Sequence, residues 1–231
     1  MLELNISYST KKILINLAVV VGISILGYID FRWPFYKLFP DLWWSRWAWM
    51  ASFLVLVSLL ASALGGLGRW LQGQGAEEKI WSILNKLPRN FFHKGSVVLG
   101  KRGDIDEVVV GPTGIWTIEV KSHAGKITFD GKELRRNGEL FKKDFLRQAL
   151  AEKYAVHDFL GDKFRRNLLV QPVIVFSSPH AEILFGLGPI NGGVYVVSSN
   201  YLRELIQNTM VQSLDDQTIE AVSKVLETYK Q

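Results

Sequence analysis

The sequence contains no cysteine, which excludes disulfide bonds and thiolate metal sites. Its four histidines are scattered without the spacing of metal ligands, and its glycines form no phosphate-binding loop motif. The net charge of +5 is mild, and the residues after position 69 carry only +2 of it. Overall charge therefore does not identify nucleic acid as a partner, and a nucleic-acid surface would have to be a local basic patch.

Charge is also missing from two long apolar runs, 13–29 and 47–67. Because roughly 20 apolar residues cross a ~30 Å hydrocarbon core as a helix, we predict two transmembrane helices there. The connector between them is rich in tryptophan and arginine, as is typical of membrane–water interfaces. A signal peptide and a buried core helix are the alternatives for the first run, but it continues into Tyr28 and Asp30 without a small-residue cleavage site. We expect residues 1–69 to form a transmembrane hairpin.

Basic residues flank both runs and give little orientation bias. Two spans place both termini on one side of the lipid bilayer. We favour the cytoplasmic side of a prokaryotic plasma membrane because of the function argued below. A homo-oligomer is left open.

Residues 70–231 have the pattern of an α/β domain, with strands and helices mixed along the chain. A glycine-containing linker leads into a helix that ends before Pro88. The predicted strands are 96–99, 105–110, 115–120, 126–129, 170–176 and 194–197. The predicted helices are 144–160, a short one from Tyr201, and 213–230.

The stretch GDIDEVVVGPTGIWTIEVK reads as a hairpin closed by a Gly-Pro-Thr-Gly turn. If Gly111 and Gly114 close the turn, Asp106 lies across from Glu119 and Asp104 across from Lys121. Alternation then places these charged side chains on one face and the large apolar ones on the other. A bulge at Gly114 is the alternative and would move the register by one residue.

Opposed carboxylates repel each other in a sheet, so this pairing needs an explanation. One is a salt-bridge network with nearby lysines on a solvated face. The other is a divalent cation, since hard ions such as Mg²⁺ bind carboxylate oxygens together with water and phosphate. The spacing alone leaves both open.

Asp106, followed by Glu119-Val120-Lys121, resembles the acidic and lysine motif of the PD-(D/E)xK phosphodiesterase superfamily. More narrowly, the chain resembles the nuclease-related domain (NERD) family over roughly residues 74–160. The specific part is VVVGPTGIWTIEVKSHAGKI. The weaker ends are Ala76-Glu77 at a helix start, Asp104-Ile105-Asp106-Glu107 in a strand, and Asp144-Phe145-Leu146-Arg147-Gln148 at a second helix start.

Three departures from the family pattern stand out. Ala76 replaces a glycine, and Glu107 replaces the usual histidine after the aspartate, so any role of that imidazole is absent. Asp144-Phe145 replaces Asn-Pro, which bears on the loop geometry around Gln148. The two acidic positions and the lysine are intact.

The resemblance implies a restriction-endonuclease-like mixed sheet flanked by helices. It also implies a Mg²⁺ or Mn²⁺ ion held by Asp106, Glu119, the carbonyl of Val120 and, from the first helix of the domain, Glu77. Lys121 would position the attacking water or stabilise negative charge, and Gln148 would orient the substrate or that water.

A basic stretch adjoins the expected site and could contact phosphates without reading bases. Its members are Lys132, Arg135, Arg136, Lys142, Lys143 and Arg147. The alternatives are a solvated surface or attraction to anionic lipid. We therefore expect a membrane-anchored, metal-dependent nuclease that acts on DNA or another nucleic acid. A non-catalytic module that tethers nucleic acid or protein to the membrane, and a structural membrane protein, are the other hypotheses.

Overall fold

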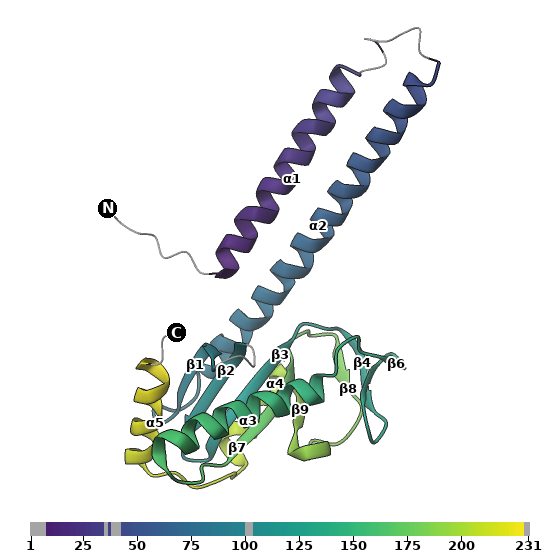
Figure 1. The fold of residues 1–231 in the computed structure, drawn as a ribbon. Helices are drawn as coiled ribbons and strands as arrows, with labels where there is room; N and C mark the ends of the chain where they lie inside the picture. Colours follow the sequence, from purple (N-terminus) through teal and green to yellow (C-terminus); the bar gives the residue numbers. More distant parts are fainter. Residues whose placement is uncertain (1–7, 35–36, 38–42, 100–103, 229–231) are drawn as a thin grey trace, which may run out of the picture. The chain divides into compact units, whose positions relative to one another are not determined.

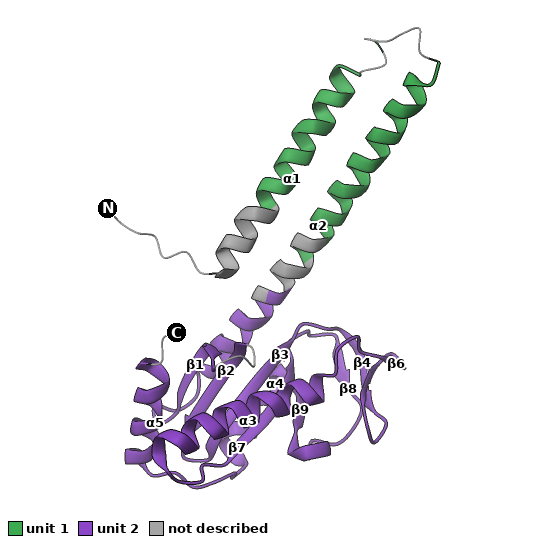
Figure 2. Ribbon diagram, viewed as in Figure 1, with its two compact units in different colours: residues 1–72 green, residues 73–231 purple. Residues whose placement is uncertain are grey.

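The computed structural model describes residues 8–34, 37, 43–99 and 104–228. The chain divides into two compact units, residues 1–72 and residues 73–231 (Figure 2). The first contains α1 (Tyr8–Arg32) and most of α2 (Ser45–Leu84). The second contains the end of α2 and every strand of the described chain.

The helices of the first unit contact each other through polar groups. Trp49 Nε1 donates to the carbonyl oxygen of Asp30 at 3.0 Å, and Ser52 Oγ donates to Asp30 Oδ2 at 3.4 Å. Leucines and valines along α2 are exposed, among them Leu54 and Leu59. An exposed apolar surface of this kind indicates contact with another apolar phase.

One helix of the described residues is long and apolar enough to cross a membrane, and it is the segment Ser45–Gly65. Its mean hydropathy is 2.0, and no residue of its 18-residue apolar window is buried, unlike the core helix of a soluble protein. The first predicted span, 13–29, does form helix, within α1, but it is not supported as a membrane span. Residues 13–16 of this predicted span lie outside the described side chains, and the candidate span found among the described residues is Ser45–Gly65. The predicted two-helix transmembrane hairpin is therefore reduced to one candidate span.

The second unit is built on a five-stranded sheet of order β1-β2-β3-β7-β9 (Figure 1). The strands are β1 (Phe92–Val98), β2 (Asp104–Gly111), β3 (Gly114–Lys121), β7 (Val170–Phe176) and β9 (Tyr195–Ser198). Strands β1, β2 and β3 are antiparallel, whereas β3, β7 and β9 are parallel. The apolar sequence of β7, VQPVIVF, fits a strand that is covered on both faces.

Helices cover both faces of this sheet. One face packs against α3 (Phe145–Phe164) and α5 (Asp216–Thr228) through Val156, Leu160, Val222 and neighbouring residues. The other packs against α4 (Ser199–Asn208) and residues 76–84 of α2, with Trp116 buried between them. The predicted mixed sheet flanked by helices is confirmed at this level.

A second, four-stranded sheet has the order β6-β5-β4-β8. Its strands are β4 (Gly125–Phe129), β5 (Leu134–Arg136), β6 (Glu139–Leu140) and β8 (Ala181–Ile183). Ile127 and Leu134 of this sheet share a core with Phe145 and Ala149 of α3 and with Phe176 of β7. The start of α3 is thereby fixed between the two sheets. A turn of 3-10 helix, η2 (Asn191–Gly193), precedes β9.

Two predictions about element boundaries were wrong. The first strand runs from Phe92 to Val98, not 96–99, because Phe92, His93 and Lys94 pair with β2. The expected glycine-containing linker before Glu77 is helix, since α2 continues to Leu84.

Candidate active site

The predicted pairs of Asp106 with Glu119 and of Asp104 with Lys121 are not part of the observed ladder. The predicted hairpin register is confirmed for the rest of the hairpin, from Gly111 paired with Gly114 to Glu107 paired with Ile118. The regular ladder ends at that last pair. Beyond it, the Asp106 carboxylate takes the place of a backbone acceptor, and Oδ2 accepts a hydrogen bond from the N–H of Val120 at 2.7 Å. On the other side of β2, Ser96 has a positive φ of 52° and interrupts the pairing with β1. Strand β2 is therefore irregular at Asp106, as expected where a strand aims a side chain at a site.

Lys121, at the end of β3, joins three groups. Its Nζ forms an ion pair with Glu119 Oε1 and donates to Gln148 Oε1 at 3.4 Å. The same ammonium group lies 4.4 Å from the centre of the Phe145 ring. Glu119 is 3% exposed, so the ion pair is largely removed from solvent. The structure thus brings Glu119, Lys121 and Gln148 together.

Gln148 is positioned by the first turn of α3. Asp144 is the N-cap of this helix, and its side chain accepts a hydrogen bond from the Arg147 N–H at 3.0 Å. The Gln148 N–H bonds to the Asp144 carbonyl oxygen at 3.1 Å. Aspartate is a favoured N-cap, so the change from Asn-Pro to Asp144-Phe145 keeps the helix start and the position of Gln148.

The pKa of Asp106 reflects its burial and the carboxylates around it. Burial raises the pKa of Asp106 to about 7, and the Glu119 carboxylate adds to the rise by repulsion, while the hydrogen bond from Val120 acts against it. Glu77 raises it further, whereas Lys121 lowers it. Asp106 and Glu119 are therefore close enough to repel, and Lys121 is the neighbouring cation that offsets this.

Glu77, in the α2 segment that packs on the sheet, lies at the margin of the group. Loss of hydration raises the pKa of Glu77, followed by repulsion from Glu107 and Glu119. Because the Glu77 side chain is exposed, the repulsion from Glu107 and Glu119 is the cause of the raised pKa that relates Glu77 to the site. Val120 was expected to offer its carbonyl oxygen to the ion. In the structure, its N–H donates a hydrogen bond to Asp106 Oδ2.

Glu107 is buried on the other face of β2. Its Oε2 lies 3.4 Å from His93 Nδ1, and His93 Nε2 lies 3.2 Å from Asn85 Oδ1. The glutamate that replaces the family histidine thus has an imidazole partner from β1. This pair is separate from the Lys121 contacts.

The structure adds Glu152, which was not predicted from the sequence. It is 4% exposed, and its Oε1 accepts a hydrogen bond from Gln148 Nε2 at 3.1 Å. Burial raises the pKa of Glu152 to about 9, together with hydrogen bonding to and repulsion from Glu119. The available signal was its spacing of four residues from Gln148, which places both on one face of a helix.

The predicted basic stretch is divided between two elements. Lys132, Arg135 and Arg136 lie on the β4–β5 hairpin, whereas Lys142, Lys143 and Arg147 lie at or before the start of α3. Arg135 is partly neutralised by Asp130, since Arg135 Nε and Asp130 Oδ2 are 2.7 Å apart. The backbone N–H of Glu133 and the Arg135 side chain lower the pKa of Asp130 to about 2. The other five are exposed and form no ion pair with an acidic side chain of the described residues.

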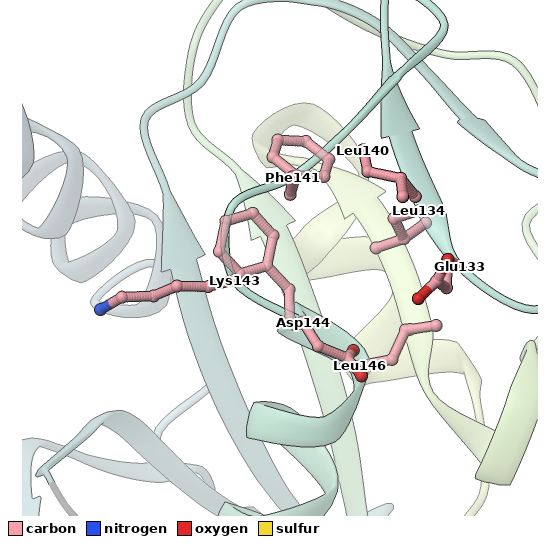
Figure 3. Close-up of a pocket in the computed structure, with 8 residues that line it drawn as sticks. Glu133, Leu134, Leu140, Phe141, Lys143, Asp144 and Leu146 are labelled. Atoms are coloured by element: carbon pink, nitrogen blue, oxygen red, sulfur yellow. The ribbon is translucent and has the colours of Figure 1, made fainter.

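A small cavity adjoins the start of α3 (Figure 3). Its volume is about 60 Å³, and its lining includes Leu134, Phe141 and Phe145. The side chain of Lys143 extends away from the other labelled residues (Figure 3). This space accepts water but is too small for a nucleobase.

His123 contacts two aromatic rings that line the cavity, Phe141 and Phe145, and the Phe145 ring also contacts Lys121. It packs against Phe141 and Phe145 with ring centres 5.3 Å and 5.6 Å away, and its Nδ1 is buried without a hydrogen-bond partner. Burial lowers the pKa of His123, and the positive charges of Arg136 and Lys121 lower it further. Arg136 is therefore the hairpin cation that reaches the site electrostatically.

The oxygen atoms of these carboxylates are the type of ligand that a hard divalent cation prefers, but the side chains are not arranged as a complete set of metal ligands. Glu119 Oε2 and Glu152 Oε2 are buried and lack a hydrogen-bond partner. Carboxylate oxygens are the preferred ligands of Mg²⁺, which retains several waters. Within the described ranges, no three carboxylate or imidazole side chains stand close enough to form a ready metal-binding group. Glu77, Asp106, Glu119 and Glu152 are instead linked by mutual repulsion.

Comparison with known proteins supports the resemblance found in the sequence. No curated protein and no solved structure matches the chain significantly. A family model described as the nuclease-related domain matches residues 72–177. This range includes Glu77, Asp106, Glu119, Lys121, Gln148 and Glu152. The segment that carries the candidate active site thus matches the model of the nuclease-related domain (NERD) family.

Proposed function

We propose that residues 73–231 form a divalent-metal-dependent nuclease that hydrolyses phosphodiester bonds in DNA or another nucleic acid. The observation that carries this proposal is the meeting of Asp106, Glu119 and Lys121 at the irregular end of the β2–β3 hairpin. The match to the nuclease-related domain supports the reaction class. A sheet that needed only stability would not place two carboxylates against each other.

Asp106 and Glu119 would hold the Mg²⁺ or Mn²⁺ ion, with the carbonyl of Val120 and with Glu77 at the margin. A bound ion of this kind polarises a phosphate and lowers the pKa of a coordinated water. Lys121 would exchange its ion pair with Glu119 for contact with that water or with the phosphate. Gln148, fixed by Lys121 and Glu152, would orient the substrate backbone or the water.

The exposed cations on each side of the site would hold the nucleic-acid backbone. Arg136, Lys142, Lys143 and Arg147 suit this role because they are exposed, and Lys132 lies farther along the hairpin. Arg135 would take part only by leaving Asp130. Such contacts neutralise phosphates without reading base sequence, so binding should weaken steeply with salt.

The test uses the full chain purified in detergent. It is incubated with supercoiled plasmid or single-stranded DNA in Mg²⁺, in Mn²⁺ or in a chelator. We expect metal-dependent cleavage that falls by at least ~100-fold in both Glu119→Gln and Lys121→Ala. Glu78→Gln, an exposed neighbour of Glu77, is the matched control and should retain activity. Cleavage that is equal in wild type and Glu119→Gln would refute the proposal.

A second function is favoured by one observation. Lys121 is engaged by Glu119, and no ready three-ligand metal group exists among the described residues. This suits a module that binds nucleic acid or protein without cleaving. DNA binding that persists in Glu119→Gln and Lys121→Ala, with no cleavage by the wild type, would establish it.

We also propose that the segment Ser45–Gly65 anchors the chain in a prokaryotic plasma membrane, with residues 73–231 in the cytoplasm. Support comes from the length, hydropathy and exposure of that segment. A cytoplasmic side is required for contact with cellular nucleic acid. The proposal leaves a homo-oligomer open.

A further inference from the structure

Glu152 has one unused oxygen in a buried position. The side chain projects from α3 one turn after Gln148, and Oε1 accepts the hydrogen bond from Gln148 Nε2. Oε2 is buried and has no hydrogen-bond partner. Burying an ionised carboxylate oxygen without a partner is costly, and a cation bound at this oxygen would offset that cost and favour the ionised form.

Glu119 presents a matching oxygen from β3. Its Oε1 is paired with Lys121, whereas its Oε2 is buried and unpartnered. Lys121 Nζ contacts both Glu119 Oε1 and Gln148 Oε1, and Gln148 Nε2 donates to Glu152 Oε1, so Lys121 and Gln148 connect the two glutamates. Because ionised carboxylates are acceptors only, the two can bond to each other only when one is protonated. A strand and a helix thus each contribute one buried carboxylate oxygen without a hydrogen-bond partner, and the two side chains are connected through Lys121 and Gln148.

A structural role does not explain this arrangement well. An apolar side chain at position 152 would fill the space between α3 and β3 without the repulsion between two buried carboxyls. A divalent cation would supply charge to both unpartnered oxygens at once. Mg²⁺ is commonly held by one or two carboxylates, with water and phosphate completing its six ligands.

We propose that Glu152 is a ligand of the divalent cation, paired with Glu119 across the junction of α3 and β3. This inference rests on the proposed function, because it concerns the same ion. It also explains the role of the hydrogen bond from Gln148, which fixes Oε1 and leaves Oε2 free for the ion. Asp106 would then be the third carboxylate that the ion draws in, because it is repelled by Glu119 and Glu152 in the absence of a cation.

The test measures Mn²⁺ binding to the full chain in detergent by electron paramagnetic resonance, which detects free Mn²⁺, in the absence of substrate. The variants are Glu119→Gln, Glu152→Gln and Glu152→Asp, with Asp162→Asn as the matched control. Asp162 is an exposed acid on the same helix, so its replacement removes the same charge. We expect wild-type affinity in Asp162→Asn and at least a tenfold loss in Glu119→Gln and in Glu152→Gln. Glu152→Asp should retain more affinity than Glu152→Gln because it keeps a carboxylate.

Glutamine can donate to Glu119, as a protonated glutamic acid would, so Glu152→Gln separates ligation from positioning. Wild-type Mn²⁺ affinity in Glu152→Gln, with loss in Glu119→Gln, would overturn the inference and leave the proposed function standing. If the wild type binds no Mn²⁺, the proposed function fails as well. Should Glu152→Gln not fold, Glu152→Leu, which removes the carboxylate and keeps most of the side-chain volume, takes its place: at least a tenfold loss of Mn²⁺ affinity supports the inference, and wild-type affinity overturns it.

Discussion

Lys121 shows how much the site depends on individual side chains. It contacts Glu119, Gln148 and the ring of Phe145, which come from two different elements. Removing its charge would leave Glu119 buried without its cation, a change that typically destabilises a protein by about 3–5 kcal/mol. Activity measurements on Lys121→Ala therefore need a parallel check of folding.

The raised pKa values at the site predict how stability depends on pH. In the folded chain, the pKa is about 7 for Asp106 and about 9 for Glu152, above the ordinary pKa values of 3.8 and 4.5. The folded state therefore binds these protons more tightly than the unfolded chain. Their stabilising contribution is full below the unfolded pKa values and is lost as pH rises through about 7 and then about 9.

We expect the metal-free chain to melt at a lower temperature as pH rises across this window. Replacing Asp106 by Asn, or Glu152 by Gln, removes one titration each and should flatten the corresponding part of the curve. The measurement is thermal denaturation in a chelator at a series of pH values. A melting temperature that rises between pH 5 and pH 9 in the wild type, and identical curves in the variants, would contradict this account.

At the same scale, the sequence predicted Asp106, Glu119 and Lys121 from motif and alternation and Gln148 from the family resemblance, and the structure brings the last three into contact. The sequence did not indicate Glu152, since a glutamate on a helix is ordinarily exposed and its burial depends on how α3 packs on β3. Nor did it indicate that Arg135 is paired with Asp130. Both depend on contacts made after the elements assemble.

Among the elements, the β2–β3 hairpin was the most predictable. Its turn chemistry and two-residue periodicity specify the register without help from the rest of the chain. The small second sheet was largely missed, since β5, β6 and β8 have two or three residues each and β8 pairs with β4 across distant sequence. Strand β1 was placed too late because Phe92 to Lys94 become strand through pairing with Val108 to Val110.

Two glycines provide a matched prediction about element stability. Gly114 has a φ of 130°, and a Cβ there would lie 2.9 Å from Val211 Cβ and 3.3 Å from the Gln212 nitrogen. Gly114→Ala should therefore destabilise the hairpin by about 1–3 kcal/mol. Gly161 lies within α3 and has open space at its Cβ, so Gly161→Ala should stabilise by about 0.5–1 kcal/mol.

Urea denaturation of both glycine variants and the wild type gives the comparison. Opposite signs support the backbone assignment at the two positions. Equal or stabilising effects at Gly114 would show that the turn does not hold this glycine in the conformation described.

On the scale of the whole molecule, the membrane prediction depends on the segment Ser45–Gly65. Leu54, near its middle, is 62% exposed. A lysine at the centre of a membrane helix costs about 2.5–3.5 kcal/mol of insertion. We expect Leu54→Lys to move a measurable share of the chain from the membrane fraction into the soluble or aggregated fraction.

The matched control is Leu184→Lys, an equally apolar residue that is 55% exposed in the second unit. It should leave the distribution unchanged. Cell fractionation with an alkaline wash and immunoblotting gives the result. Equal behaviour of the two lysine variants, both remaining with the membrane, would count against Ser45–Gly65 as the anchor.

The sequence also suggested a second span, and the difference affects topology. A single span places the termini on opposite sides of the bilayer, whereas two spans place them on the same side. Because the chain lacks cysteine, single cysteines introduced near each end can report the side of the membrane without background labelling.

The contacts of Lys121 have a practical consequence for spectroscopy. An ammonium group that is held against an aromatic ring and an ion-pair partner reacts slowly with reagents that methylate free amines. Under mild reductive methylation with isotope-labelled formaldehyde, Lys121 should therefore acquire its label after the exposed lysines. Its methyl resonance, shifted by the ring current of Phe145, would then record in real time when this amine leaves its partners.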